Sequence, residues 1–448
     1  MKRLDKAAEA IARSILHCDS MRVISHNDAD GITSAGLICN ALLRAGIPFQ
    51  ATLLNRLDES ILDGLNGPVV FCDMGSGKPE LISRIKGDCF VLDHHRPVGT
   101  LSCMHLNPHL FGIDGAFELS ASGTVYSVVR HMGENADLSG LALVGAMGDR
   151  QGMIGANRAI LDEAVASGAV QLKAGLKMAA DGPVEDVFAG SVEPLLDFTG
   201  QPEKARRFLK ELEIGGSVES LPEEELNRLC TALTLKLLVQ GSFAADAVIG
   251  EVIRLNHEVV ENAKELVELL NACGNRDLPG LGLTLCLRDK SSLEEARKLA
   301  AEYRGHIIRE IGILREKSRT MKNIRYLKTE NMEAGAIVSG LGIRYLYTDM
   351  PLITLNHKDD MVKISARGSK PLISRGLDLS VALRSAAAAV GGAGGGHTIA
   401  SGASIPPGSE DRFLALVDGI VGEQLQGADA KHAALPVDET RDRTEDGA

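Results

Sequence analysis

The chain is poor in aromatic residues. Its 448 residues include no tryptophan, five tyrosines and ten phenylalanines. Proteins that hold single-stranded nucleic acid without reading its sequence commonly stack successive bases on aromatic side chains. The scarcity of aromatic residues therefore disfavours a stacking surface, and any contact with nucleic acid is expected to go through the phosphate backbone.

Long apolar segments are absent as well. No uninterrupted apolar run reaches the roughly 18 residues that indicate a membrane-spanning helix. The N-terminal residues Met1-Lys2-Arg3-Leu4-Asp5 lack the apolar core of a signal peptide. The sequence therefore predicts a cytoplasmic protein that has no membrane partner.

The eight cysteines include no C-x-x-C pair. Several of them, such as Cys72, Cys89 and Cys286, lie inside apolar runs, which is typical of reduced thiols that fill a core. The cysteines therefore predict neither a thiolate zinc site nor a disulfide framework.

Acidic residues outnumber basic ones and give a net charge of −12. This balance argues against a protein that wraps nucleic acid with its whole surface. One segment departs from it, because Arg304 to Lys328 contains eight Lys or Arg residues and only two Glu. Two interpretations of this segment remain open, a solvated helix face and a stripe that contacts phosphates.

The first 150 residues alternate between short apolar runs and helical patterns. The expected strands are 22–25, 49–54, 69–72 and 89–92. The expected helices are 4–18, 31–45 and 79–86, with further ones at 124–132 and 138–147. Short apolar strands that alternate with helices are typical of an α/β fold, in which helices cover both faces of a mostly parallel sheet.

The rest of the chain changes its pattern twice. Residues 156–290 are predicted to be mainly helical, with a strand-like run at 282–287, and 291–330 are predicted to form a basic connecting helix. The segment 331–425 is predicted to be a smaller α/β domain with a strand at 334–338 and a hairpin at 351–366. The acidic tail, 426–448, is predicted to be disordered.

Acidic and histidine side chains follow three of the predicted strands. His26, Asp28 and Asp30 follow the first strand, Asp73 follows the third, and Asp93-His94-His95 follows the fourth. Sites in parallel sheets form at the carboxyl ends of the strands. Buried carboxylates and imidazoles need a partner, and a divalent metal satisfies both.

Asp149 ends a later predicted helix and completes a set of mostly oxygen ligands with one or two imidazoles. Such a set suits Mn²⁺ or Mg²⁺ better than zinc, and two such ions about 3.5–4 Å apart promote phosphoryl transfer. Each residue also has a structural explanation. Asp28 or Asp30 can cap the helix that begins near Gly31, Asp149 can end a helix in a turn, and His94 can be a hydrogen-bonded core histidine.

Four motifs contain these residues: His26-Asn27-Asp28-Ala29-Asp30-Gly31, Asp73, Asp93-His94-His95 and Gly148-Asp149. In order and spacing they resemble the four motifs of the DHH phosphoesterase superfamily. Ser365-Ala366-Arg367 with Gly394-Gly395-Gly396-His397 resembles its companion, the DHHA1 domain. The resemblance implies a DHH catalytic domain at 1–155, a helical, partner-binding insertion at 156–290 and a DHHA1 substrate-binding domain at 331–425.

The resemblance also implies a role for each residue of the DHH motifs. His26, Asp28 and Asp73 would hold one of two Mn²⁺ or Mg²⁺ ions. Asp30, Asp73, His94 and Asp149 would hold the other, so that Asp73 bridges the pair. Asp93 and His95 would act in catalysis, because Asp93 orients a histidine and His95 stabilises charge on the scissile phosphate.

In the DHHA1 motifs the resemblance implies contacts with the substrate. The guanidinium of Arg367 would bind two phosphate oxygens. Gly394, Gly395 and Gly396 would let the backbone approach a phosphate closely, and His397 would meet the substrate beside them.

The long connection between the DHH and DHHA1 motifs favours one group of family members. About 215 residues separate Asp149 from Lys363. Segments 270–274, 280–283 and 286–287 resemble archaeal RecJ-like proteins, including the nuclease associated with the GINS replication complex. This resemblance implies a metal-dependent exonuclease that degrades single-stranded DNA from its 5′ end, with GINS or other replisome proteins as candidate partners at roughly 206–270.

Three alternatives stay open. The same chemistry could act on single-stranded RNA, including from the 3′ end, since no motif reads a 2′-hydroxyl. The chain could instead hydrolyse short oligonucleotides or cyclic dinucleotides, which the large insertion disfavours. A third alternative is a non-catalytic replisome scaffold, although scaffold members of the family lose metal ligands and this chain keeps the full set.

Overall fold

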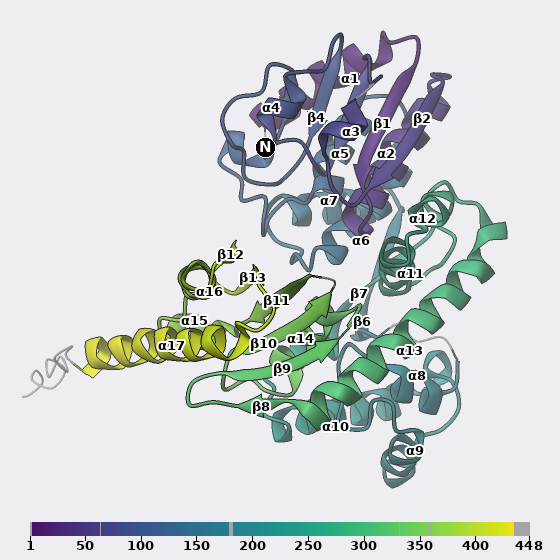
Figure 1. The fold of residues 1–448 in the computed structure, drawn as a ribbon. Helices are drawn as coiled ribbons and strands as arrows, with labels where there is room; N and C mark the ends of the chain where they lie inside the picture. The colour runs from purple at the N-terminus through teal and green to yellow at the C-terminus, as the bar shows by residue number, and fades with distance from the viewer. Residues whose placement is uncertain (1, 63, 179–181, 331, 359, 434–448) are drawn as a thin grey trace, which may run out of the picture. The chain divides into compact units, whose positions relative to one another are not determined.

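A computed structural model describes residues 2–62, 64–178, 182–330, 332–358 and 360–433 (Figure 1). The chain divides into two compact units. The first unit is Met1–Ala180 with Ile249–Tyr303, and the second is Asp181–Val248 with Arg304–Ala448. Helix α17, Glu410–Ala433, takes in the first residues of the predicted disordered tail, and 434–448 lie outside the described residues.

A five-stranded, wholly parallel sheet forms the centre of the first unit, in the order β2-β1-β3-β4-β5. The strands β1 to β5 are Met21–His26, Phe49–Leu54, Val69–Cys72, Cys89–Leu92 and Met104–Leu106. Every residue of β3 and β4 is buried, which explains why these strands are continuous apolar runs. The predicted α/β fold with a parallel sheet is confirmed.

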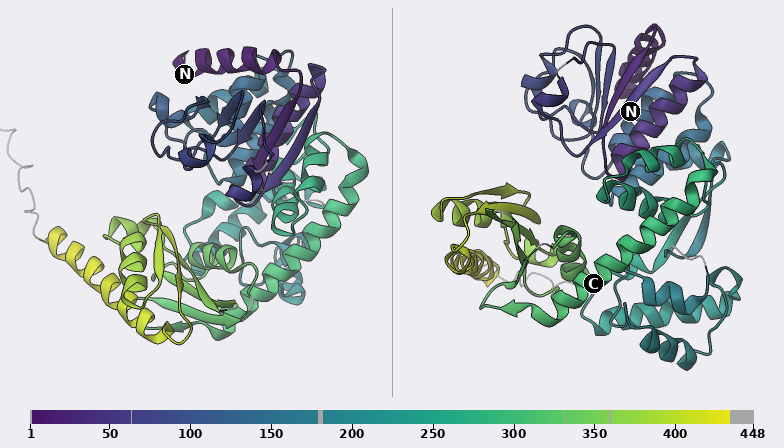
Figure 2. Two further views of the ribbon diagram at one scale, coloured as in Figure 1. Left: turned by 45° about the horizontal axis from the view of Figure 1, so that its top comes forward. Right: turned by 45° about the vertical axis from the view of Figure 1, so that its right-hand side comes forward.

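Helices cover both faces of this sheet (Figures 1 and 2). Helix α2, Ala29–Arg44, packs on β1 and β2, and α5, Ala121–Val129, packs on β3 and β4. Helix α1, Lys2–Leu16, packs against α5. The short helices α3, Glu59–Leu62, and α4, Pro79–Ile82, cover the opposite face.

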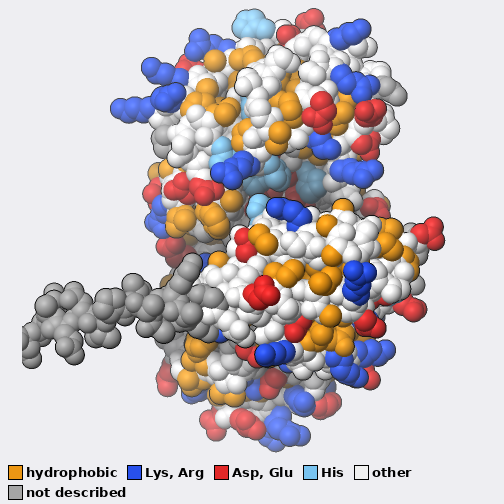
Figure 3. Space-filling view, turned by 60° about the vertical axis from the view of Figure 1, so that its left-hand side comes forward, with side chains coloured by type: hydrophobic (Ala, Val, Ile, Leu, Met, Phe, Trp, Pro, Cys, Tyr) orange, Lys and Arg blue, Asp and Glu red, His pale blue; other side chains and the backbone are white. Residues whose placement is uncertain are grey.

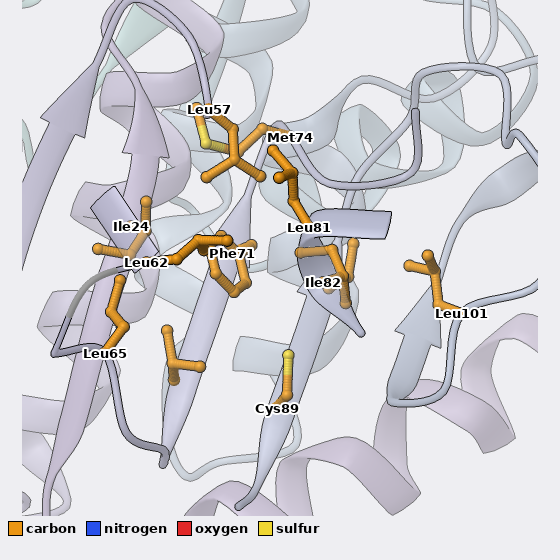
Figure 4. Close-up of a cluster of buried hydrophobic side chains, with 12 residues drawn as sticks. Ile24, Leu57, Leu62, Leu65, Phe71, Met74, Leu81, Ile82, Cys89 and Leu101 are labelled. Carbon is orange, nitrogen blue, oxygen red and sulfur yellow. The ribbon is translucent and has the colours of Figure 1, made fainter. Parts of the chain in front are cut away.

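Alternation along the strands divides the core between the two faces. Ile24 and Phe71 point into a cluster with Leu62 of α3 and Ile82 of α4 (Figure 4). Val91 of β4 belongs to the same cluster. The strand neighbours of these residues point to the other face because successive strand residues alternate. Six of the eight cysteines are buried, as predicted for thiols that fill the core, whereas Cys18 and Cys103 are half-buried.

The remainder of the first unit is mainly helical. Helices α6, Ser139–Gly148, and α7, Gly155–Ala166, precede an antiparallel pair, β6 Val170–Leu176 with β7 Ile249–Leu255. Helices α11, Ala263–Asn275, and α12, Pro279–Cys286, follow. The strand predicted at 282–287 is wrong, because this segment belongs mainly to α12. A short, apolar and buried run does not distinguish a strand from a helix by its periodicity.

The second unit contains a six-stranded mixed sheet in the order β12-β13-β11-β10-β9-β8. Strands β8 to β13 are Arg319–Thr320, Arg325–Glu330, Leu352–Lys358, Met361–Arg367, Ala393–Gly396 and Ala400–Ile405. The helices are α8 Val184–Gly190, α9 Pro202–Glu211, α10 Glu223–Val239, α14 Gly335–Tyr345, α15 Lys370–Ser374, α16 Leu379–Ala389 and α17. The hairpin predicted at 351–366 is confirmed by β10 and β11.

Helix α13, Leu293–Lys317, contributes residues to both units. The basic helix predicted to continue to residue 330 is wrong, because the chain forms β8 and β9 after Lys317. The strand predicted at 334–338 is also wrong, since these residues open helix α14.

Among the described residues, every helix is too short or too polar to cross a lipid bilayer. Acidic and basic side chains are interspersed over the face of the molecule that Figure 3 shows.

A charged network fixes helix α2 to later parts of the first unit. Asp137 accepts two hydrogen bonds from Arg44 of α2, at 2.7 and 2.8 Å, and one from Arg288, at 2.6 Å. Arg288 also donates to Glu258 at 2.9 Å. The hydrogen bond from Arg44 is the main cause of a lowered pKa of Asp137. The folded protein therefore favours the ionised carboxylate.

Replacing Asp137 with Asn is expected to lower the free energy of unfolding by about 1–3 kcal/mol, because the substitution removes charge-assisted hydrogen bonds. A depressed pKa stabilises the fold at pH values above the unfolded-state pKa of about 3.9, and this contribution is lost as the pH falls through the folded-state value. Urea unfolding should therefore give the same loss at pH 6 and pH 8 and a smaller one below about pH 4. Asp162→Asn, in the exposed pair with Arg158, is the control and should cost less than about 0.5 kcal/mol.

Candidate metal centre

The register of the parallel sheet brings three motif residues to one edge. Ser25 of β1 lies beside Cys72 of β3, and Cys72 lies beside Leu92 of β4. The next residues, His26, Asp73 and Asp93, therefore occupy neighbouring positions at the carboxyl ends of their strands. The chain leaves β1 toward β2 on one side and later returns to β3 on the other, and such a switch point is where open parallel sheets form sites.

Asp73 lies at the centre of this edge. It is 3% exposed, and its backbone has a φ of +58°, a left-handed conformation that is uncommon outside glycine but more frequent for Asp and Asn. One carboxylate oxygen, Oδ2, lies 3.5 Å from His26 Nδ1, and the other, Oδ1, lies 3.3 Å from His94 Nε2. Asp73 therefore faces two separate groups of side chains.

His26, Asp28 and Asp73 form the first group. The Nε2 of His26 lies 3.1 Å from the carbonyl oxygen of Asn55 and donates to it, which leaves Nδ1 facing Asp28 Oδ2 at 3.0 Å. The other oxygen of Asp28 accepts from the Gly31 amide at 2.9 Å and caps helix α2. The capping explanation for Asp28 is thus correct, and it coexists with a place in the cluster.

Asp30, His94 and Asp149 form the second group. The Nδ1 of His94 donates to the carbonyl oxygen of Gly115 at 2.7 Å. This bond directs Nε2 toward Asp149 Oδ2 at 3.3 Å and Asp30 Oδ2 at 3.9 Å. A hydrogen bond at one ring nitrogen that orients the other is the usual support of a metal-binding histidine.

Asp30 is completely buried and is held by the start of helix α5. Its two oxygens accept hydrogen bonds from the amides of Ala121, at 2.7 Å, and Ser122, at 2.9 Å. The positive end of a helix dipole also stabilises a carboxylate. Gly145 of α6 passes so close that a Cβ there would lie 2.4 Å from Asp30 Oδ1.

Asp93 accepts more hydrogen bonds than the other acids of this edge, and its donors are backbone amides and a histidine. It accepts from the amides of Ser76, His94 and His95, at 2.8, 2.7 and 3.1 Å. It also accepts from His95 Nδ1 at 2.8 Å. The side chain of His95 is 59% exposed, so its Nε2 is directed away from Asp93 and is accessible.

The protonation of the two buried histidines reflects the negative charge around them. Burial alone would lower the pKa of His26, but the carboxylates of Asp28 and Asp73 outweigh it and raise this pKa to about 11. The pKa of His94 also rises to about 11, since Asp73 and Asp30 outweigh its burial. Without a metal, the site therefore holds protons at neutral pH.

The pKa values of Asp30 and Asp149 are also raised, by burial and by the negative charge around them. Burial and the neighbouring Asp73 raise the pKa of Asp30 to about 6. Burial and the charge of Asp30 raise the pKa of Asp149 well above its ordinary value. Like charges that approach one another make ionisation harder, and an additional positive charge relieves this repulsion.

Two buried polar atoms at the centre of the site, His26 Nδ1 and Asp73 Oδ1, make no hydrogen bond of good geometry among the described residues. Asp28 Oδ2 and His94 Nε2 lie 3.0 and 3.3 Å from them, respectively. The side chains of Asp73, His94 and His95, of His26, Asp28 and Asp73, and of Asp30, His94 and Asp149 each offer ligand atoms within 4.8 Å of one another. Carboxylate oxygens with two imidazoles suit Mn²⁺ and Mg²⁺. The residues present therefore fit divalent cations.

Sequence reasoning missed the groups that hold these side chains in place. Most are backbone atoms, such as the carbonyls of Asn55 and Gly115 and the first amides of α5, and no residue type marks them. Gln151 is an exception with a side chain, which donates to the Gly115 carbonyl at 2.8 Å. In the sequence, only its position two residues after Asp149 indicated that Gln151 supports the site.

The DHHA1-like motifs lie together at one end of the second sheet. Arg367 ends β11 and lies beside Ala400 of β13. Ala400 and His397 exchange backbone hydrogen bonds of 2.8 and 3.2 Å across a tight turn. Gly394 to Gly396 form the edge strand β12, with φ of +138° at Gly396. Arg367, the glycines and His397 are thus brought together, in a unit separate from the acidic cluster.

Exchange of Asp73 for Asn is expected to abolish stabilisation of the protein by manganese. With Mn²⁺ at 100 times its dissociation constant, wild type should gain about 2.7 kcal/mol in the free energy of unfolding. Asp73→Asn removes the charge shared by both groups while keeping a residue that tolerates the left-handed backbone. Thermal unfolding with EDTA and with Mn²⁺ measures the difference. An equal manganese shift in both proteins would contradict a metal site at Asp73.

Two family models and one curated relative match the chain in sequence. The family model "DHH family, N-terminal domain" matches residues 20–146, and the model "DHHA1 domain" matches residues 326–423. Uncharacterized protein MJ0831 of Methanocaldococcus jannaschii is 34% identical over 442 residues, which cover 95% of this chain and 99% of that protein.

The chain also resembles solved structures in its fold. RecJ of Thermus thermophilus in complex with Mn²⁺ has a TM-score of 0.61 at 17% identity, and the match covers 94% of this chain but 55% of that chain. The same RecJ has also been crystallised with Mg²⁺. CDC45 of Entamoeba histolytica has a TM-score of 0.64 at 12% identity and matches 93% of this chain and 99% of that one. The chain therefore belongs to the DHH family and joins its N-terminal domain to a DHHA1 domain in a RecJ-like fold.

Proposed function

We propose that this protein is a divalent-metal-dependent exonuclease that hydrolyses single-stranded DNA, in preference to RNA, from the 5′ end. The observation that carries the proposal is the convergence of seven acidic and histidine side chains at the sheet switch point. Two buried atoms among them make no hydrogen bond of good geometry within the described part of the chain. The RecJ-like fold supports a hydrolase of phosphate esters. A role in DNA replication or repair follows from such a substrate.

Two Mn²⁺ or Mg²⁺ ions fit the two groups of side chains. His26, Asp28 and Asp73 would hold one ion, and Asp30, Asp73, His94 and Asp149 would hold the other. Bound there, the ions would lower the pKa of a water held between them and neutralise charge that develops on the phosphate. The carbonyls of Asn55 and Gly115 keep His26 Nδ1 and His94 Nε2 directed inward.

His95 is suited to contact the scissile phosphate. Burial would lower its pKa, but the hydrogen bond with Asp93 is the larger influence and raises it. Since Asp93 holds Nδ1, a protonated His95 presents Nε2–H as a donor to a phosphate oxygen. A donor fixed in advance stabilises the extra negative charge of the transition state.

The DHHA1 motifs would bind the rest of the strand. Arg367 can donate two parallel hydrogen bonds to a phosphate. Gly394 to Gly396 carry no side chains of their own, which would allow a phosphate to approach the backbone closely, and His397 lies in the adjoining turn. None of these groups contacts a base in a manner that would specify sequence, so processive degradation without sequence preference is expected.

A replisome scaffold is the second candidate function, and the likeness in fold to CDC45 favours its consideration. The retained acidic and histidine cluster argues for hydrolysis. The two roles are compatible in one protein, and the helical region at roughly 206–270 is the candidate surface for GINS or another replisome protein. Affinity capture with purified GINS subunits tests that partner separately from activity.

His95→Ala is expected to lower kcat on an oligonucleotide by roughly 10²–10³-fold, the cost of removing one fixed donor to a developing oxyanion. The stabilisation by Mn²⁺ should stay, because His94 and the carboxylates are unchanged. Hydrolysis rates and thermal unfolding, measured on the same preparation, separate these effects. Equal activity of the variant and wild type would refute the role of His95.

Wild-type protein with Mn²⁺ is expected to release mononucleotides from 5′-labelled single-stranded DNA faster than from RNA of the same sequence. Asp30→Asn should lower this rate at least about 10³-fold, since several kcal/mol of transition-state stabilisation depend on the metal site. Strands labelled at either end, with Mn²⁺ and Mg²⁺ compared, give the polarity and the preferred metal. Absence of hydrolysis by wild type on every strand would instead favour the scaffold.

A further inference from the structure

The second unit contains a cavity of about 610 Å³ that the metal centre and the DHHA1 motifs do not explain. It lies where the parallel strands β9 and β10 end, between these strands and helix α13. The carboxyl ends of parallel strands are a common place for ligands. The volume falls in the range of small-molecule sites, about 300–1,000 Å³.

Helix α13 contributes one wall with a regular pattern. Arg309, Ile313 and Lys317 follow one another at intervals of four residues and all line the cavity. Residues four apart lie on one helix face, and eight residues span about 12 Å along the axis. This wall therefore has a cation at each end and an apolar side chain between them.

The strands contribute the facing wall. Lys328 and Thr329 come from the end of β9, His357 comes from the end of β10, and Met332 follows β9. Lys328 pairs with Asp411 and His357 lies 3.3 Å from Glu410. The side chain of Asp411 is 92% exposed. Exposed ion pairs contribute little stability, so an anionic ligand can replace Asp411 as the partner of Lys328.

The acidic lining residue Glu310 makes hydrogen bonds within the protein. Glu310 is 4% exposed and accepts from the amides of Glu333, at 2.8 Å, and Ala334, at 3.1 Å. His306 donates to it at 2.8 Å and accepts from Arg309 at 3.3 Å. Because these donors satisfy Glu310, its charge is compensated from within the fold. Among the described lining residues, Glu330 at the rim is the only other acid.

The basic residues of the segment 304–328 differ in their surroundings. Three of its arginines have structural contacts: Arg315 donates to the carbonyls of Leu196 and Thr199, Arg319 to neighbouring carbonyls, and Arg325 stacks on Tyr347 at 4.0 Å. By contrast, Arg309, Lys317 and Lys328 converge on the cavity. All three side chains are exposed, and they gather around one cavity.

We propose that this cavity is an additional binding site for a phosphodiester strand, with phosphates at Arg309 and Lys317. The apolar side chains of Ile313 and Met332 would contact a sugar or base between them, and the hydroxyl of Thr329 would donate or accept a hydrogen bond. An inorganic phosphate would use only one end of the cavity, whereas successive nucleotides use both. The inference rests on the proposed function in taking a nucleic-acid strand as the ligand.

Fluorescence anisotropy with a 5′-fluorescein-labelled oligodeoxynucleotide and the full-length protein in EDTA tests the site without hydrolysis. Arg309→Ala with Lys317→Ala is expected to weaken binding about tenfold or more. The slope of log affinity against log salt should fall by about 1.4, since each lost phosphate contact on a single strand removes about 0.7. Arg309→Lys with Lys317→Arg should restore binding to within about threefold of wild type.

Lys298→Ala with Lys322→Ala is the matched control, because it removes two exposed positive charges outside the cavity. It should change affinity by no more than about twofold. Equal weakening by both double variants would show general electrostatic attraction and overturn the inference. So would unchanged binding by the Arg309/Lys317 variant.

Adenosine monophosphate, titrated in the same assay, distinguishes a strand from a free nucleotide. Displacement of the oligonucleotide by this nucleotide at a similar dissociation constant would overturn the assignment to a strand. Loss of binding in the cavity variant with no hydrolysis by manganese-loaded wild type would retain this site and refute only the proposed activity.

Discussion

The repulsion among four carboxylates is the constraint on which the first unit depends. Asp28, Asp30, Asp73 and Asp149 converge at one sheet edge, and Asp30 and Asp73 are almost completely buried. Uncompensated buried charges cost several kcal/mol each. Protons on His26 and His94, or cations in their place, supply the missing positive charge. A positive charge placed among these carboxylates would relieve their repulsion.

Backbone groups around the site fix the positions of the charged side chains. Helix α5 directs its first two amides at Asp30, and the carbonyls of Asn55 and Gly115 each hold one histidine nitrogen. These groups come from segments distant in sequence, so the site requires the whole α/β layer to be folded. Donors within the protein occupy both oxygens of Asp93, and the only side chain among these donors in the described residues is that of His95.

The sequence predicted the parts of this protein that depend on local pattern. The strands β3 and β4 are short apolar runs, and the acids that follow them mark the sheet edge because parallel strands share one direction. The apolar run at 282–287 was misassigned because burial on all sides removes the periodicity that separates a helix from a strand. Lys317 to Glu330 was misassigned because a run of basic residues carries no information on where a helix stops.

For the site, the side-chain groups were predictable and their supports were not. The roles of His26, Asp28, Asp73 and the other motif residues stay predictions, although the structure brings them together as expected. The supports are backbone carbonyls and amides, which every residue has, and only the tertiary fold selects among them. The same holds for the cavity beside α13, whose lining joins residues from α13, β9 and β10.

A residue can be conserved because the fold needs it or because the activity needs it, and Asp30 and His95 differ in this respect. The carboxylate of Asp30 anchors the N-terminus of α5 to α2, so the fold loses stability without it whether or not the protein hydrolyses anything. His95 is largely exposed and is attached chiefly to Asp93. In a relative of this chain, a retained Asp30 is therefore a weak sign of an active enzyme. A retained His95 is a stronger one, because the fold gives little reason to keep it.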